Sequence, residues 1–170
     1  QANWNYFTMY RFKWTEKQVG VSLAVVGVLV GLVQGGLIRV INPRLGNAKS
    51  IYLGLTLYGI GLALFAFATQ SWMMYVFLIP YCLGGIAGPA LQSIITEKVP
   101  ANEQGQLQGG LTSLMSATSI VGPYIMTNLF YYSVSDNGSF YFPGAPFLLG
   151  SILMFISALL AWTFLKKKLI

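Results

Sequence analysis

The sequence predicts an all-α membrane protein with five transmembrane helices, and three observations lead to this fold class. Hydrophobic residues make up 55% of the 170 residues and charged residues only 8%, with a mean hydropathy of +0.64. A soluble domain usually carries about 25% charged residues, because its surface faces water. The apolar residues also gather into long runs that are almost free of charge. A helix of about 20 residues crosses the hydrocarbon core, where the backbone can bond only to itself. The predicted spans are residues 18–41, 51–70, 72–95, 107–132 and 146–165.

The stretch before the first span, residues 1–16, is expected to be an external lead-in. It lacks a basic region followed by an apolar core, so it is not a secretory signal peptide. Residues 17–170 are expected to form one transmembrane bundle.

The first span carries a ladder of small residues with a polar residue on the same side. Gly27, Gly31 and Gly35 follow one another at intervals of four, and Gln34 lies on that face. Such a ladder lets another helix approach closely, where lipid gives no hydrophobic drive for association. Gln34 is therefore either a satisfied amide in a packing face or a polar group that lines a cavity.

The third and fourth spans each carry a polar stripe and a Gly-Pro pair. Proline removes a backbone hydrogen bond and favours a kink. In the third span the stripe and its kink are formed by Tyr81, Gly85, Gly88, Gln92 and Pro89. In the fourth span they are formed by Gly109, Thr112, Ser116, Ser119, Pro123, Thr127 and the neighbouring Asn128. These side chains are expected to face protein or water, although Ser and Thr hydroxyls also often bond to their own backbone one turn earlier.

The second and fifth spans contain few strongly polar side chains. We expect them to be outer supports that face lipid.

Two polar loops, each near basic residues, are candidates for a latch between helix ends. Pro43 and Gly46 predict a tight reversal between the first two spans, where Arg44 and Lys49 lie at the membrane surface. The second loop, after Glu97, contains VPANEQGQLQGG, in which Val99 and Pro100 end one helix and Asn102 can cap the next. Glu103 is then well placed at the positive end of that helix.

The basic residues predict the orientation in the membrane. Seven of the ten fall on one side: Arg39, Arg44, Lys49, Lys98, Lys166, Lys167 and Lys168. The other side holds Arg11, Lys13 and Lys17. The positive-inside rule therefore predicts a cytoplasmic C-terminus.

Several function classes are disfavoured by what the sequence lacks. There is no His, and Cys82 is the only cysteine, so no metal site and no disulfide framework are expected. No charged residue lies deep in a span, and no Gly-rich loop with its Lys is present to hold ATP. The basic residues do not form a soluble cluster that would suit nucleic acid. The four acidic residues lie at loops and no nucleophile and base are paired, so an enzyme is not expected.

These segments resemble the C-terminal half of a major facilitator superfamily transporter, of the tetracycline-resistance type of drug:proton antiporters. The resemblance covers essentially the whole chain and is carried by GLVQGG, NPRLGNAKSIYLG, TQSW, GGIAGPALQSIIT and VPANEQGQLQGGLTSLMSATSIVGP. It implies spans eight to twelve of a twelve-helix fold, after a seventh helix that is not included. It also implies an N-terminal six-helix half as partner, a small-molecule substrate, protons, no cofactor, and a bacterial inner membrane.

The resemblance also implies roles for single residues. Arg44, Gly46 and Lys49 match the weaker second copy of the family's cytoplasmic loop motif, and Gln34 falls at a cavity-facing Gln. Tyr58 stands where exporters of this type often carry an acidic residue.

The sequence thus predicts part of a secondary transporter that exports drugs or other small amphipathic molecules by alternating access. The expected substrate-binding residues are Gln34, Tyr81, Gln92, Thr112, Ser116 and Asn128. An alternative is a five-span scaffold or assembly subunit that binds partner helices through its glycine faces.

Overall fold

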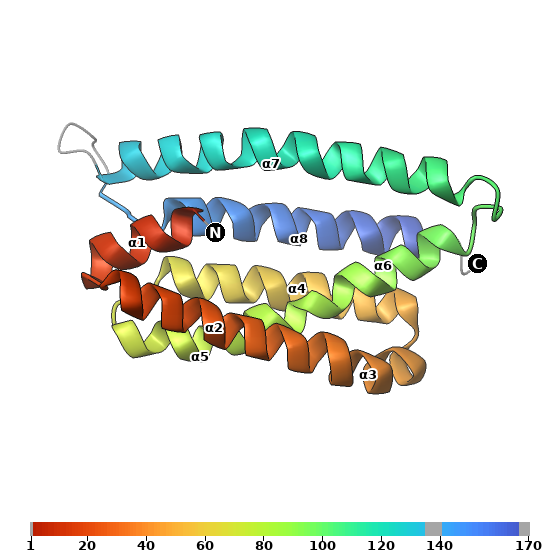
Figure 1. The fold of residues 1–170 in the computed structure, drawn as a ribbon, viewed down its shortest axis with the longest axis horizontal. Coiled ribbons are helices and arrows are strands. Elements are labelled where there is room, and N and C mark those ends of the chain that lie inside the picture. Colours follow the sequence, from red (N-terminus) through yellow and green to blue (C-terminus); the bar gives the residue numbers. More distant parts are fainter. Residues whose placement is uncertain (1, 135–140, 167–170) are drawn as a thin grey trace.

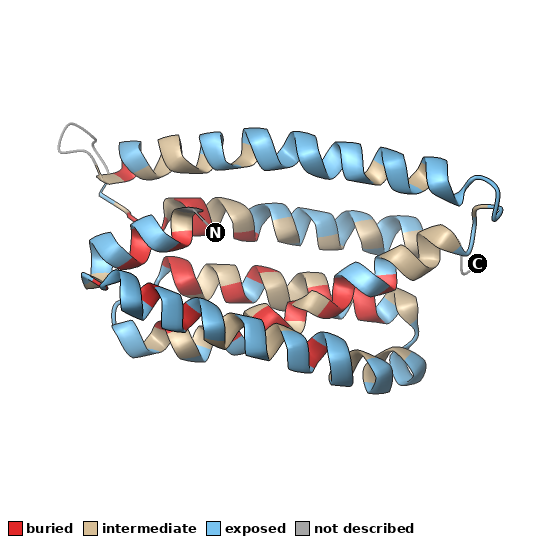
Figure 2. Cartoon of the chain, in the orientation of Figure 1, coloured by how far each residue is buried: buried red, intermediate tan, exposed pale blue. Residues whose placement is uncertain are grey.

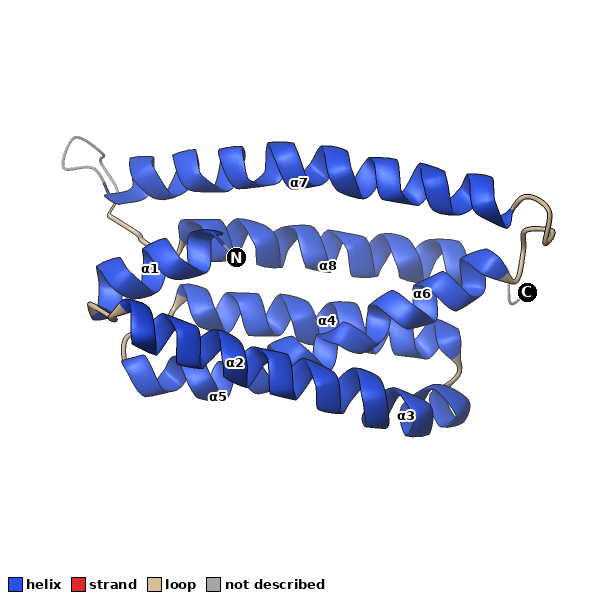
Figure 3. Ribbon diagram, in the orientation of Figure 1, coloured by secondary structure: helices blue, strands red, loops and turns tan. Residues whose placement is uncertain are grey.

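The computed structural model describes residues 2–134 and 141–166, and all regular structure in them is helical (Figures 1 and 3). The α-helices are α1 Ala2–Phe12, α2 Glu16–Leu32, α3 Ile38–Leu45, α4 Asn47–Ala66, α5 Ser71–Leu83, α6 Ala87–Thr96, α7 Gln104–Val134 and α8 Ala145–Lys166. A π-helix, η1, covers Val33–Leu37 between α2 and α3, and a 3₁₀-helix, η2, covers Gly84–Ile86 between α5 and α6. Asp136, Lys167 and Lys168 lie outside the described residues.

The helices form five long rods, and each of the five predicted spans falls mainly within one of them. Four rods are long and apolar enough to cross a membrane: Glu16–Leu45, Asn47–Ala66, Ser71–Thr96 and Ala145–Leu165. The fifth, α7, is a continuous helix of 31 residues. It is not among those four, since amide, hydroxyl and glycine residues dilute its apolar character.

Residues 1–16, which were expected to be a lead-in without a predicted helix, contain α1. This helix joins the core through Trp4 and Phe7, which are 8% and 1% exposed. The indole Nε1 of Trp4 donates to the Ser22 hydroxyl at 3.0 Å, which ties α1 to α2. α2 begins with a capping box between Thr15 and Gln18, which satisfies free amide groups of its first turn.

The expectation that the second span faces lipid is wrong, because α4 is the packing centre of the chain. It lies between α8 on one side and α5, η2 and α6 on the other (Figures 1 and 2). Its glycines let the neighbouring backbones come close: a Cβ added at Gly54 would lie 2.7 Å from the Ala87 nitrogen, and one at Gly61 would lie 2.7 Å from the Tyr81 Cα. Lipid tails are as apolar as Leu, so a span without polar residues can equally well face protein.

α7 and α8 are much less covered. Only 6% of the residues in the most apolar 18-residue stretch of α8 are buried. The main neighbours of α7 among the described helices are α8 and α1, and most of its length is exposed (Figure 2). Large apolar side chains such as Ile120 and Tyr124 are 76% and 73% exposed. These two helices therefore present broad apolar surfaces to lipid or to other protein.

The connections collect at the two ends of the bundle. The α3–α4 and α6–α7 loops and the end of α8 lie at one end (Figure 1). The α1–α2 and α4–α5 loops and the segment before α8 lie at the other. The predicted basic loops thus share one end of the bundle.

Candidate functional site

Two of the long rods depart from regular α-helical geometry within their length, and the departures face each other. The π-helix η1 and the 3₁₀-helix η2 are in contact. A Cβ built on Gly85 would lie 3.9 Å from Nε2 of Gln34. Short π and 3₁₀ segments within α-helices change the carbonyl pairing and often mark functional sites and hinges. Gln34 therefore places an amide beside two irregular turns.

The face of the rod that carries Gln34 is not covered by the described chain. Gln34 and the ladder residues Gly27, Gly31 and Gly35 are all exposed. A Cβ added to any of the three glycines would meet no atom within 4 Å, and the same is true of Gly88. The expectation that this ladder packs against another helix is therefore not met inside this chain. The tight contacts occur instead at glycines of α4 and η2 and at Gly144, just before α8.

Tyr81 lies apart from the Gln34 face, in the interface between α5 and α4. Its hydroxyl accepts a 2.9 Å hydrogen bond from Tyr58, and the two ring centroids are 4.4 Å apart. Tyr81 also lines an aromatic cavity of about 210 Å³ between α1, α2, α4, α5 and α8, together with Trp4 and Phe65. Sequence spacing had placed Tyr81 with Gly85 and Gln92 on one polar stripe. The backbone of Tyr81 instead packs closely against Gly61 of α4, and the Tyr81 ring lies against the rings of Tyr58 and Phe65.

The polar residues of α7 do not gather around Gln34, because the main neighbours of α7 among the described helices are α8 and α1. Gln92 is half-buried, and its carbonyl accepts from the Thr96 hydroxyl at 2.9 Å. Thr112 and Ser116 are exposed on α7. Asn128 donates from Nδ2 to the Tyr124 carbonyl of its own helix at 2.8 Å.

Other hydroxyl groups of α7 also donate hydrogen bonds to backbone carbonyls of their own helix. Ser113, Thr118 and Ser119 all donate to carbonyls three or four residues earlier. Pro123 lies inside unbroken α7, whereas Pro89 stands in the first turn of α6, next to η2. Of the two Gly-Pro pairs, only the one in the third span therefore coincides with a departure from α-helix.

At the loop end, a hydrogen-bonded chain joins α4 to α6. Nδ2 of Asn47 donates to the Ser93 hydroxyl at 3.0 Å, and Ser93 donates to a Glu97 carboxylate oxygen at 2.9 Å. Gly46, which separates α3 from α4, has φ +79°, a conformation that favours glycine. Arg44, Lys49 and Glu103 are exposed. The sequence did not single out Asn47 and Ser93, because only their proximity in space, and not their spacing, pairs them.

The described residues include no group of three His, Cys, Asp or Glu side chains that could hold a metal ion. The two helix breaks lie inside apolar rods, and the hydrogen-bonded chain of Asn47, Ser93 and Glu97 lies at the end of the bundle. This arrangement suits a membrane protein whose long helices move relative to one another.

Comparison with known proteins identifies the family. The family model described as Major Facilitator Superfamily matches residues 3–169. The chain belongs to the Major Facilitator Superfamily. It is thus a multi-pass membrane protein of a transporter family and not an enzyme.

Its relatives include tetracycline resistance proteins. The class C protein of Escherichia coli is 40% identical over 87% of this chain and 38% of its own length. The class E protein of Escherichia coli is 45% identical over 75% of this chain and 31% of its own length. The human protein named Hippocampus abundant transcript-like protein 1 is 26% identical over 85% of this chain and 31% of its own length. The chain spans about a third of the length of these relatives. No solved structure gives a significant match.

Proposed function

We propose that the chain forms part of a secondary transporter that exports drugs or other small amphipathic molecules in exchange for protons. The observation that carries this proposal is the contact between η1 and η2, with Gln34 at the break and an uncovered face beside it. Transporter sites are typically formed by irregular helices near the membrane midplane, where one helical bundle rocks against another. The tetracycline resistance proteins among the relatives support a drug as substrate.

The five rods then correspond to spans eight to twelve of a twelve-helix fold, and an N-terminal six-helix half covers the Gln34 face. The protein lies in the bacterial inner membrane. The end of the bundle with Arg44, Lys49 and Lys98 faces the cytoplasm, together with the C-terminus, because basic loops remain inside.

Alternating access requires contacts at the loop ends that break and re-form. The chain from Asn47 through Ser93 to Glu97 is suitable, because each hydrogen bond contributes about 0.5–1.5 kcal/mol. Gln34 is the first residue we assign to substrate, followed by Gln92 and the α7 residues Thr112, Ser116 and Asn128. The α7 residues reach the substrate path only when the N-terminal six-helix half brings α7 toward Gln34.

Replacement of Gln34 tests this proposal. In the complete protein, Gln34→Ala is expected to weaken drug affinity about two- to tenfold, the size of one lost hydrogen bond. Val28→Ala is the matched control, since Val28 is 63% exposed on the same rod and offers no polar group. Efflux from cells and drug binding to purified protein would both be measured. Unchanged transport and affinity in Gln34→Ala for every exported drug would remove Gln34 from the site.

A second candidate function is a scaffold that binds partner helices. The open ladder of Gly27, Gly31 and Gly35 favours it, because such faces mediate helix association in membranes. The scaffold predicts a stable, monodisperse complex with other chains that is disrupted by Gly31→Leu, and no drug export.

A further inference from the structure

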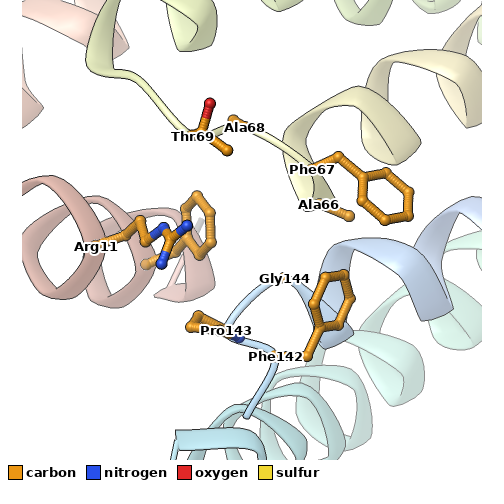
Figure 4. Close-up of a pocket in the computed structure, with 9 residues that line it drawn as sticks. Arg11, Ala66, Phe67, Ala68, Thr69, Phe142, Pro143 and Gly144 are labelled. Carbon is orange, nitrogen blue, oxygen red and sulfur yellow. The ribbon is translucent and has the colours of Figure 1, made fainter.

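A second pocket lies at the end of the bundle opposite the basic loops, away from the Gln34 face. Its volume is about 150 Å³, and it is lined by the last turn of α1, the α4–α5 loop and the segment before α8. Figure 4 shows the Arg11 side chain extending toward this space, with Thr69 on one side and Phe142 and Gly144 on another. None of these residues belongs to the site proposed for transport.

The pocket carries a positive charge and no described negative one. Arg11 is exposed, and no acidic side chain lines the pocket. The first turns of α5 and α8, which begin beside it, contain no acidic residue either. A guanidinium presents a planar fork of donors that matches phosphate and carboxylate oxygens. The pocket is therefore suited to an oxyanion.

The side chains around the pocket indicate how deep in the membrane it lies. Phe67 and Phe142 form one wall, with ring centroids 5.7 Å apart. Exposed aromatic side chains lie at this end among exposed polar and charged ones: Phe67 is 61% exposed, Trp72 59% and Tyr10 46%. Exposed aromatic residues mark the boundary between hydrocarbon and water, where lipid headgroups lie.

We propose that this pocket binds the phosphate of an anionic phospholipid headgroup in the leaflet at this end. Arg11 holds the phosphate, Thr69 offers a hydroxyl, and the rings of Phe67 and Phe142 pack against the glycerol. A cavity of about 150 Å³ holds roughly one benzene ring. It can therefore take a phosphate with its glycerol but not the acyl chains, which would lie along the outside of the helices. The proposal requires only that the bundle spans a membrane, and it is independent of drug transport.

Lipid retention by the full-length gene product tests the proposal. The protein would be purified in detergent, incubated with phosphatidylglycerol or phosphatidylcholine, and examined by native mass spectrometry. We expect one phosphatidylglycerol to bind at least about tenfold more tightly than phosphatidylcholine. Arg11→Gln should remove that difference and Arg11→Lys should keep most of it. Lys17→Gln, which removes one exposed charge at the same end and does not line the pocket, should leave it unchanged.

Three results would overturn the proposal. Equal binding of the two lipids would show that no anion is recognised. Equal retention of phosphatidylglycerol by Arg11→Gln and the unsubstituted protein would place the lipid elsewhere, once size-exclusion chromatography shows that the variant is folded. Glycerol phosphate that binds this site as tightly as phosphatidylglycerol would show that the acyl chains contribute nothing and that the site takes a soluble phosphate.

Discussion

The glycines of α4 allow a graded prediction about what holds the bundle together. A Cβ at Gly61 would lie 2.7 Å from Cα and 2.8 Å from both N and Cβ of Tyr81. Real Cβ atoms do not approach backbone so closely, so Gly61→Ala must push α5 away from α4. Such overpacking costs about 1–3 kcal/mol, with a clash against backbone at the upper end. The higher helix propensity of Ala offsets about 1 kcal/mol of this cost, which leaves a net loss of about 1–2 kcal/mol.

Gly59 provides a matched control in the same helix. A Cβ there would lie 3.2 Å from the ring of Phe155, which is a side chain that can turn aside by a few tenths of an ångström. Gly59→Ala also gains helix propensity, because Ala is favoured over Gly by about 1 kcal/mol in a helix. The two effects roughly cancel, so we expect Gly59→Ala to change the free energy of unfolding by less than about 1 kcal/mol.

Thermal unfolding of the purified full-length protein in detergent, followed by size-exclusion chromatography, would measure both effects. For a domain of 150–250 residues, 1 kcal/mol corresponds to about 2–4 °C in Tm, and this is an upper limit for the full-length protein. Gly61→Ala is expected to lower Tm by up to about 8 °C and Gly59→Ala by less than about 3 °C. A Gly61→Ala protein as stable as the unsubstituted one would refute the close approach of α4 and α5. A larger loss in Gly59→Ala than in Gly61→Ala would refute the ranking.

Two further substitutions test single hydrogen bonds between helices. Ser151 donates to the Gly59 carbonyl at 2.8 Å and is 2% exposed, so Ser151→Ala should lower the free energy of unfolding by about 1 kcal/mol. Ser157→Ala on the same helix should be nearly neutral, since Ser157 bonds only to its own helix, and equal effects in thermal unfolding would contradict the assignment. Tyr81→Phe should cost about 0.5–1.5 kcal/mol in the same assay, because it removes the acceptor of the Tyr58 hydroxyl, and a stabilised variant would contradict that hydrogen bond.

The long helices and their order were predictable because hydropathy and helix length are local properties. Each of the five apolar runs became a rod, and Gly46 became the predicted reversal. α1 was missed, since a helix of 11 residues carries no membrane-length signal. The position of α1 is fixed instead by contacts with residues distant in the sequence, such as that of Trp4 with Ser22.

Which face of a span meets protein was much less predictable. α4 has few polar residues and was expected to face lipid, yet Gly54 and Gly61 bury it against α5 and α6. The ladder at Gly27 and Gly31 has the same local pattern and meets nothing in this chain. A glycine spacing shows that a helix can be approached closely, but the neighbour is decided by the rest of the fold.

The candidate site residues remain predictions. Gln34 lies within the π-helix η1, a departure from α-helical geometry that the glycine ladder did not predict. Tyr81 was grouped with it by helical spacing, but its long side chain leans into the α4 interface, where Tyr58 supplies a partner. The sequence left open whether the hydroxyls of α7 face a cavity or bond to their own backbone one turn earlier. Ser119 and others do bond to their own backbone.

Water access to residue 34 tests the central claim most directly. Gln34→Cys and Leu32→Cys would be made in a cysteine-free version of the complete protein, since the two side chains point to nearly opposite sides of the rod. The rate of reaction with a water-soluble maleimide would be measured with and without an exported drug. We expect Cys at 34 to react rapidly and to be protected by the drug, while Cys at 32 reacts slowly in both conditions. If the two positions react at the same rate and the drug protects neither, the helix breaks do not line a transport path.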